Sequence, residues 1–274
     1  MIKAIFSDID GTLLNSRHQI TPGTKTVIQE VKEREIPFVL VSARMPRGIL
    51  PLQQELEIDA PVICYSGALV LGGSDGGGRE TLHSIGLNHN SVKAILDIVS
   101  TSFPDTSISL YSHDQWIVAD RFDPWVIQEQ EIVNVEPAER ELSAYLDEDP
   151  EIHKILCMGH PEEINRLTRT LQTIVPGISL YKSKDTYLEI MDEMVSKSYA
   201  IRELEEVFHI SNQELMAIGD NYNDIDMILY AGLGIAMGNA PDEVKQIADK
   251  VTLSNDEDGL KDGIERFVLF PGSQ

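Results

Sequence analysis

The sequence predicts an α/β protein with a Rossmann-like parallel-sheet core that is interrupted by an inserted α+β domain. At both ends of the chain, short apolar runs typical of buried strands alternate with amphipathic helical segments, which favours a parallel sheet. Between residues 84 and 186 several strand-like pieces occur for each helix, and this ratio favours an antiparallel sheet. We therefore expect a core formed by residues 1–83 and 187–274 and an inserted domain formed by residues 84–186.

The core elements are expected in a strict alternation. Strands are predicted at residues 2–6, 37–41, 61–65, 215–218, 234–237 and 250–252. Thr21 and Pro22 have the side chains of an N-cap and a first helical residue, so a helix is predicted to begin there. Further helices are expected up to Leu56, over residues 196–208, and after Asp224. Parallel neighbours require crossover connections, and these helices would supply them.

The inserted region is expected to contain helices over 91–102 and 161–174 and strands over 107–111, 116–119, 155–158 and 179–181. Just before it, residues 69–71 and 79–82 predict a hairpin around a glycine-rich loop. That loop lacks the Lys-Ser/Thr pair and the following helix of a phosphate-binding loop, so we interpret it as a turn.

Charge and composition exclude several classes of partner. The chain has 274 residues and a formal net charge of −23, which argues against binding to nucleic acid or to an anionic membrane. The negative charge does not exclude a phosphorylated small molecule as substrate, because a metal and a few local cations can make the electrostatic potential inside one cleft positive. Two cysteines, no secretory signal and no apolar run of membrane-spanning length predict a cytoplasmic protein. The sequence carries no signal for an oligomeric state.

Two acids follow the first predicted strand directly. Asp8 and Asp10 are two residues apart, and Gly11 after them allows a sharp turn. On an extended backbone both carboxylates would point to the same side, where their like charges repel unless a cation or a proton intervenes. A plain polar turn is the alternative. The position at a strand end favours a site, because α/β sheets bind ligands at the carboxyl ends of their strands.

A second acidic group follows the predicted strand at residues 215–218. Asp220 and Asp224 are about one helical turn apart, so both can face one cleft. Asn223 is expected in the first turn of the next helix, where backbone N–H groups favour an anion. Helix capping by Asp224 is the alternative. Repetition of the pattern at two strand ends favours a shared site.

Several converging carboxylates call for a hard divalent cation with oxygen ligands. Mg²⁺ fits because it accepts a few carboxylates, keeps several waters and bridges to phosphate oxygen. The spacing of histidine and cysteine ligands that zinc needs is absent, and the seven histidines are scattered along the chain. Mg²⁺ is therefore the predicted cofactor.

Four pieces of the chain together resemble the motifs of haloacid-dehalogenase-like phosphohydrolases. They are the segment 8–14, Ser42 at the end of the second strand, Lys197 at a helix start, and the segment 219–224. The long insert between the second and third motifs is similar to that of the Cof-type branch, which carries an α/β cap of type IIB there. Two motifs depart from the usual pattern: residues 42–44 read Ser-Ala-Arg instead of Thr-Gly-Arg, and Ser66 replaces Asn.

The resemblance implies a role for each matching residue. Asp8 would be the nucleophile that forms an aspartyl-phosphate, and Asp10 would be the general acid and base. Asp8, Asp220 and the backbone carbonyl of Asp10 would hold Mg²⁺, with Asp224 helping directly or through water. The phosphate-binding residues would be Ser42, Lys197 and Asn223, and Lys197 would also have a catalytic role by steadying Asp8. Arg44 could form a structural ion pair.

The function predicted on this basis is a Mg²⁺-dependent phosphatase acting on a small phosphorylated metabolite, such as a sugar phosphate. The inserted domain would close over the core and select the leaving group. A sugar phosphomutase of the same superfamily would use the same two aspartates, and a phospho-accepting signalling module would also use strand-end acids and a lysine. The signalling module needs neither Asp10 nor a long insert, so the sequence disfavours it.

Overall fold

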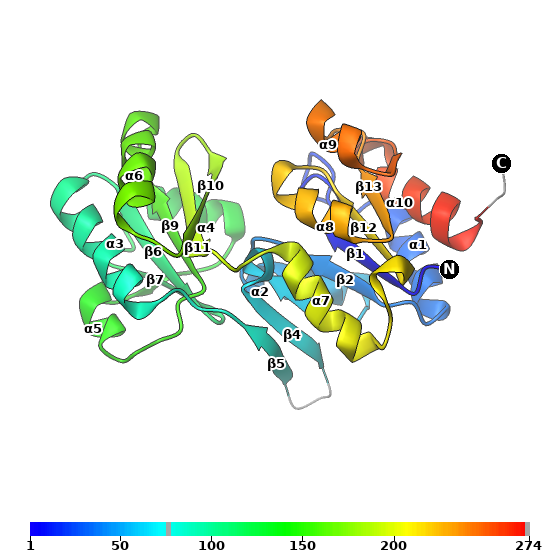
Figure 1. Cartoon of the computed structure of the whole chain (residues 1–274), viewed down its shortest axis with the longest axis horizontal. Helices are drawn as coiled ribbons and strands as arrows, with labels where there is room; N and C mark the ends of the chain where they lie inside the picture. Colours follow the sequence, from blue (N-terminus) through cyan, green and yellow to red (C-terminus); the bar gives the residue numbers. More distant parts are fainter. Residues whose placement is uncertain (75–77, 272–274) are drawn as a thin grey trace. The chain divides into compact units, whose positions relative to one another are not determined.

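The computed structural model describes residues 1–74 and 78–271, which form two compact units (Figure 1). The first unit contains residues 1–44, 49–83 and 196–274, and the second contains residues 45–48 and 84–195. We expected the chain to return to the core at residue 187. Instead, β11 (Tyr187–Asp192) pairs with β9 (Lys154–Met158) of the second unit, so the chain returns only after Val195.

An eight-stranded sheet organises the first unit, in the order β14-β13-β12-β1-β2-β3-β4-β5. All neighbours from β14 to β3 run parallel, as predicted, and β4 runs antiparallel to β3. The strands are β1 (Ala4–Asp8), β2 (Phe38–Val41), β3 (Val62–Cys64), β4 (Leu69–Ser74), β5 (Arg79–Ser84), β12 (Leu215–Gly219), β13 (Leu233–Ala236) and β14 (Lys250–Val251). The two strands of the predicted hairpin, β4 and β5, are neighbours in the sheet, and residues 75–77 of its turn lie outside the described residues.

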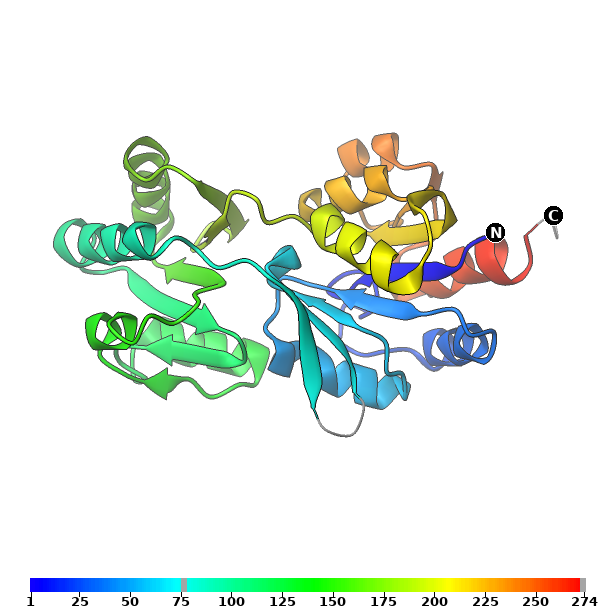
Figure 2. The same cartoon turned by 60° about the horizontal axis from the view of Figure 1, so that its bottom comes forward.

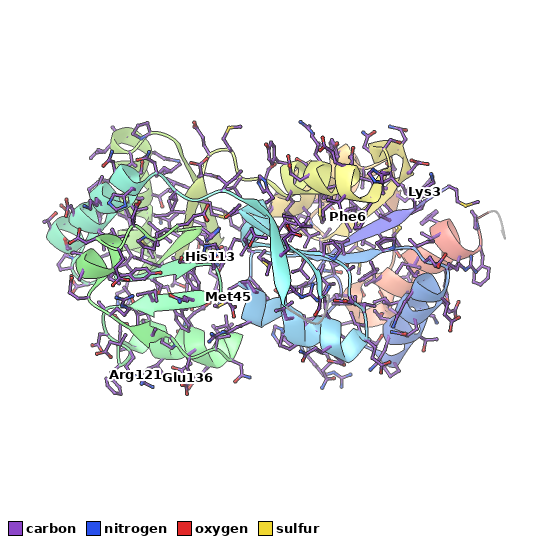
Figure 3. All side chains as sticks on the ribbon, turned by 90° about the horizontal axis from the view of Figure 1, so that it is seen from below. Lys3, Phe6, Met45, His113, Arg121 and Glu136 are labelled. Atoms are coloured by element: carbon purple, nitrogen blue, oxygen red, sulfur yellow. The ribbon has the colours of Figure 1, made fainter. Side chains whose placement is uncertain are left out.

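Helices cover both faces of this sheet (Figure 2). On one face, α7 (Lys197–Phe208) and α8 (Ile225–Tyr230) bury an apolar cluster that includes Phe6 of β1, which is labelled in Figure 3. On the other face lie α1 (Pro22–Glu33), α2 (Pro46–Leu56) and α10 (Gly259–Ile264). The N-cap predicted for α1 is confirmed, since the side chain of Thr21 accepts a hydrogen bond from the Thr24 amide.

Shorter helical elements complete the first unit. They are α9 (Asp242–Ile247), a π-helical turn at Glu265–Leu269, and the 3₁₀ turns η1 (Tyr65–Gly67), η2 (Asn212–Glu214), η3 (Tyr222–Asp224) and η4 (Asn255–Glu257). Two of these turns follow strands directly: η1 follows β3, and η3 follows β12 after two residues. They place polar residues at the carboxyl edge of the sheet.

The second unit is built on a six-stranded sheet in the order β10-β11-β9-β6-β7-β8, which is antiparallel except between β7 and β8. Its remaining strands are β6 (Ser107–Ser112), β7 (Gln115–Val118), β8 (Ala138–Glu139) and β10 (Ile178–Lys184). Helices α3 (His89–Ser102), α5 (Leu142–Leu146) and α6 (Pro161–Ile174) share one apolar cluster with its strands.

The helices α4 (Pro124–Val133) and α5 of this unit were not expected, nor were the strands β8 and β11. Helix α4 does begin with a recognisable cap, because the side chain of Asp123 accepts from the Trp125 amide ahead of Pro124. Its apolar residues lack a helical period, which is why the pattern did not reveal it. Among the described residues, no helix is long and apolar enough to cross a membrane.

Candidate active site

Acids from the two ends of the chain meet at the carboxyl edge of the first sheet. Asp8 is the last residue of β1, and Asp220 follows the last residue of β12, the parallel neighbour of β1. Asp224 ends η3, the turn that follows. One carboxylate oxygen from each of these three residues lies within 4.8 Å of the other two. The predicted convergence of Asp8, Asp220 and Asp224 is therefore what the fold produces.

Lys197 places a positive charge beside these acids. It is the first residue of α7, with only 1% of its surface exposed, and Ser196 before it caps the helix. Its Nζ atom lies 2.6 Å from Asp8 Oδ1 and 2.5 Å from Asp224 Oδ1. Because one ammonium group bridges two buried carboxylates, the strand end and the turn are held in one arrangement.

Asp224 is also fixed through its second oxygen. Asp224 Oδ2 accepts hydrogen bonds of 2.9 Å from the backbone amides of Asp220 and Asn221. Asp224 therefore caps the turn, as the alternative interpretation predicted, and it also contacts Lys197. A Cβ atom on Gly219 would lie 2.5 Å from Asp224, so the turn can close this tightly only on glycine.

Asp220 is oriented by residues that the sequence analysis did not single out as functional. The hydroxyl of Thr12 donates to Asp220 Oδ1 at 2.9 Å, and Asn239 Nδ2 lies 3.5 Å from Oδ2 while donating to the Gly11 carbonyl. Gly11 has φ +86°, and a Cβ atom there would lie 2.4 Å from Asp220 Oδ2. Thr12 lies in the segment 8–14 that carried part of the family resemblance, which was the available signal for it.

Burial and like charge set the electrostatics of the site. Burial and the neighbouring Asp224 carboxylate raise the pKa of Asp8 well above its usual range, although Lys197 opposes the shift. Burial and Asp224 also raise the pKa of Asp220, to about 7. Burial would lower the pKa of Lys197, but the charges of Asp224 and Asp8 outweigh it and raise that pKa instead. Three carboxylates and one ammonium leave an excess of negative charge.

This donor set fits a hard divalent cation. The cluster offers carboxylate oxygens from three residues, and among the residues described no histidine or cysteine joins it. Both oxygens of Asp224 already bond Lys197 or backbone amides. Asp8 bonds Lys197 through Oδ1 alone, and Asp220 faces the cluster from the neighbouring strand end. Asp8 and Asp220 are therefore the residues best placed to hold the metal.

Asp10 is not among the three acids whose oxygens lie within 4.8 Å of one another, but its charge is close enough to help raise the pKa of Asp220. The expected crowding of its carboxylate against that of Asp8 stays a prediction. The chain leaves the strand at Asp8 and turns, so the alternation of an extended backbone ends there. Asp8 is buried, while the Asp10 side chain is 49% exposed. Both Asp10 oxygens accept from the Arg44 guanidinium, from Nε at 2.8 Å and from Nη2 at 2.5 Å.

Ser42 and Ser66 lie next to each other at the neighbouring strand end. Ser42 follows β2, is 3% exposed, and accepts a 3.2 Å hydrogen bond from the Arg44 amide through its hydroxyl. Its carbonyl accepts from the Ser66 amide at 2.8 Å. Ser66 has φ +54°, a left-handed conformation that small polar residues adopt more readily than branched ones. The two serines that depart from the family pattern thus share one edge of the sheet.

Asn223 lies in η3, one residue before Asp224, and is half-buried. This turn is 3₁₀ rather than the first turn of α8, which begins only at Ile225. The difference follows from the Asp224 carboxylate, which folds back onto the amides of Asp220 and Asn221 and tightens the turn. The proposed contact of Asn223 with phosphate stays a prediction.

The second unit contains a histidine cluster that the sequence did not reveal, because its members come from separate segments. Ligand atoms of His113, Glu151 and His153 lie within 4.8 Å of one another. His153 Nδ1 accepts from the His113 amide at 3.1 Å, and burial lowers the pKa of His153 to about 4. The neutral ring therefore carries its proton on Nε2, 2.9 Å from Ser84 Oγ. With this tautomer His153 presents no lone pair to a metal.

The comparisons with known proteins agree with this site. The family model described as haloacid dehalogenase-like hydrolase matches residues 5–264. A Haemophilus influenzae protein, named provisionally as a phosphatase, is 38% identical over 260 residues, which cover 95% of this chain and 96% of that protein. The 5-amino-6-(5-phospho-D-ribitylamino)uracil phosphatase YitU of Bacillus subtilis is 27% identical over 92% of this chain and 93% of its own length.

Solved structures share the whole fold. A haloacid dehalogenase-like hydrolase from Bacteroides thetaiotaomicron superposes with a TM-score of 0.87 and 30% identity, over 97% of this chain and 99% of that one. The subclass IIB sugar phosphatase BT4131 has a TM-score of 0.80 and 24% identity, over 96% of this chain and 98% of that one. At that identity the second comparison shows the fold alone.

Proposed function

Because the chain belongs to the haloacid dehalogenase-like hydrolases, we propose that it is a Mg²⁺-dependent phosphatase that hydrolyses small phosphorylated metabolites through an aspartyl-phosphate. Several relatives are named as phosphatases, so a phosphoric monoester hydrolase is the coarser conclusion. The observation that carries the proposal is the meeting of Asp8, Asp220 and Asp224 around Lys197 at one sheet edge.

In the proposed reaction, Asp8 attacks phosphorus and the bond from phosphorus to the ester oxygen breaks. Asp10 gives its proton to the departing alkoxide, and the product alcohol leaves. A water molecule then attacks the aspartyl-phosphate, Asp10 takes a proton from it, and free phosphate departs with Asp8 restored. A magnesium ion held by Asp8, Asp220 and the Asp10 carbonyl would supply the positive charge that lets one anion approach another.

The remaining residues would bind the phosphoryl group and order the site. Lys197 steadies Asp8 and offers a positive charge to the phosphate oxygens. Ser42 and Asn223 would donate to the same group. Asp224 holds Lys197 and the turn around Asp220, so we assign it a supporting role beside the metal.

The substrate class is a phosphate ester of a small polyhydroxylated compound. One relative is named for a phosphoribityl substrate, which is such a compound. The second unit, residues 84–195, would select the leaving group, as expected for an inserted domain of this kind. Nothing favours the phosphomutase or the signalling module over hydrolysis.

The decisive assay is phosphate release from a panel of sugar phosphates and from p-nitrophenyl phosphate with Mg²⁺. We expect release of free phosphate by the wild type, and loss of about 1,000-fold or more in Asp8→Asn, because an amide is a poor nucleophile. Asp105→Asn, at an exposed aspartate of the second unit, is the matched control and should keep full activity. An isomerised sugar phosphate in place of free phosphate would favour the mutase, and full activity of Asp8→Asn would refute the mechanism.

A further inference from the structure

The Arg44–Asp10 pair has a geometry that fixes the direction of a carboxylate. Arg44 Nε donates to Asp10 Oδ2 at 2.8 Å, and Nη2 donates to Oδ1 at 2.5 Å. A planar guanidinium that bonds both oxygens restrains the rotation of the carboxylate as well as its position, which an ammonium group cannot do. Asp10 lies just after β1, and Arg44 lies just after its parallel neighbour β2.

The backbone of Arg44 is itself anchored. Its amide donates to Ser42 Oγ at 3.2 Å, and its carbonyl accepts from the Tyr65 amide at 3.1 Å. Ser42 is held in turn, because its amide donates to the Ile63 carbonyl at 2.9 Å. The backbone around Arg44 is therefore held by hydrogen bonds to Ile63 and Tyr65. Because the guanidinium extends from this fixed backbone, it holds Asp10 in a fixed place.

Stability alone does not account for this pair. The Arg44 side chain is 29% exposed and that of Asp10 is 49% exposed, and ion pairs this exposed contribute little to folding. Without its partner, Asp10 would be an exposed acid after a turn, two residues from Asp8 and free to rotate. A group that transfers protons to and from a reacting oxygen must be held in hydrogen-bonding reach of it.

We propose that Arg44 is a positioning residue, which holds the Asp10 carboxyl group where it can protonate the leaving alkoxide and later accept a proton from water. Each Asp10 oxygen uses one lone pair for Arg44 and keeps a second for the reacting oxygen. The inference rests on the proposed function, because the position of Asp10 matters only if Asp10 transfers these protons. Arg44 acts through Asp10 and does not bind the phosphate.

The test is a double-mutant cycle on a sugar phosphate that the wild type hydrolyses, with Arg44→Ala, Asp10→Asn and the double variant. We expect Arg44→Ala to lower kcat at least about 10-fold and to leave KM within about threefold, since general acid–base catalysis contributes factors of 10² to 10⁴. The kcat of the double variant should match that of Asp10→Asn within about twofold, because Arg44 acts on catalysis only through Asp10. Arg44→Lys should fall between the wild type and Arg44→Ala.

Controls separate positioning from folding and from substrate binding. Arg266→Ala breaks the exposed pair with Asp262 in the same unit and should leave kcat and the melting temperature unchanged. The inference would be overturned if the kcat losses of the two single variants multiplied in the double variant. A tenfold rise of KM in Arg44→Ala, or a melting temperature of that variant several degrees below that of Arg266→Ala, would overturn it as well. Failure of the wild type to release phosphate would instead refute the proposed function.

Discussion

The ammonium group of Lys197 lies 2.5 Å from a carboxylate oxygen of Asp224, and both side chains are buried. The same ammonium bonds Asp8 at 2.6 Å, so two acids share a single positive partner inside the protein. Charges removed from water are tolerated only when they are paired and hydrogen-bonded. This pairing explains how the fold keeps an acidic site intact at the edge of its central sheet.

Lys197→Met should therefore cost stability as well as activity. Removing one partner of a buried pair leaves an uncompensated charge, and the expected loss is about 3 to 5 kcal/mol of unfolding free energy in urea denaturation. Lys3→Met is the control, because Lys3 pairs with Glu214 at the surface and its loss should cost less than about 1 kcal/mol. The double variant Lys197→Met/Asp224→Asn should recover part of the loss. Equal effects of the Lys197 and Lys3 substitutions would contradict this account.

Gly11→Ala should weaken metal binding. Its Cβ atom would lie 2.4 Å from Asp220 Oδ2, so the carboxylate or the turn must move. We expect the Mg²⁺ affinity, measured by calorimetry, to fall about 10-fold, which corresponds to about 1.4 kcal/mol. Gly177→Ala is the matched control for Gly11→Ala, because Gly177 also has a positive φ (+74°) but nothing lies within 4 Å of its Cβ position. That control should show only the backbone cost of a positive φ, with unchanged affinity.

The stability of the metal-free protein should depend on pH through Asp220. Its folded pKa of about 7 lies above the ordinary value, so the folded state binds more protons than the unfolded state between about pH 4 and pH 7. The free energy of unfolding should therefore fall as pH rises through that window in the presence of a chelator. Melting curves of the wild type and Asp220→Asn measure the effect, and the unfolding free energy of the variant should fall less as pH rises. If the stability of the two proteins changed with pH in parallel, the assignment of this effect to Asp220 would be wrong.

Removal of the metal should abolish activity without unfolding the protein. Lys197 already bridges Asp8 and Asp224, so the acidic cluster has a counter-charge of its own. In excess chelator we expect loss of phosphate release with an unchanged far-UV circular dichroism spectrum, and recovery of activity when Mg²⁺ is added back. Loss of secondary structure in the chelator would show that the metal is needed for folding instead.

The contrast between Asp8 and Asp10 shows where prediction from the sequence stops. Both acids follow an apolar strand, and the pattern of that strand predicted β1 and its place in a parallel sheet. They differ in their partners, because Asp8 bonds Lys197 and Asp10 bonds Arg44, which follows the adjacent strand β2. Local patterns carry no information about which side chain arrives from a neighbouring segment. For the same reason, the sequence could not reveal that Thr12 and Asn239 orient Asp220.

The boundary near residue 187 has a similar explanation. β11 follows β10 closely and is buried along almost its whole length, so its apolar residues could belong to either sheet. Only its pairing with β9 and β10 assigns it to the second unit.

By itself, the order of apolar runs and strand-end acids determined the parallel core, the inserted α+β unit and the family, because each of these depends on local patterns and their spacing. The tertiary structure alone decided that Lys197 bridges Asp8 and Asp224 while Asp10 pairs with Arg44. Those contacts join residues far apart in the chain, and only the packing of strands and helices brings their charges together.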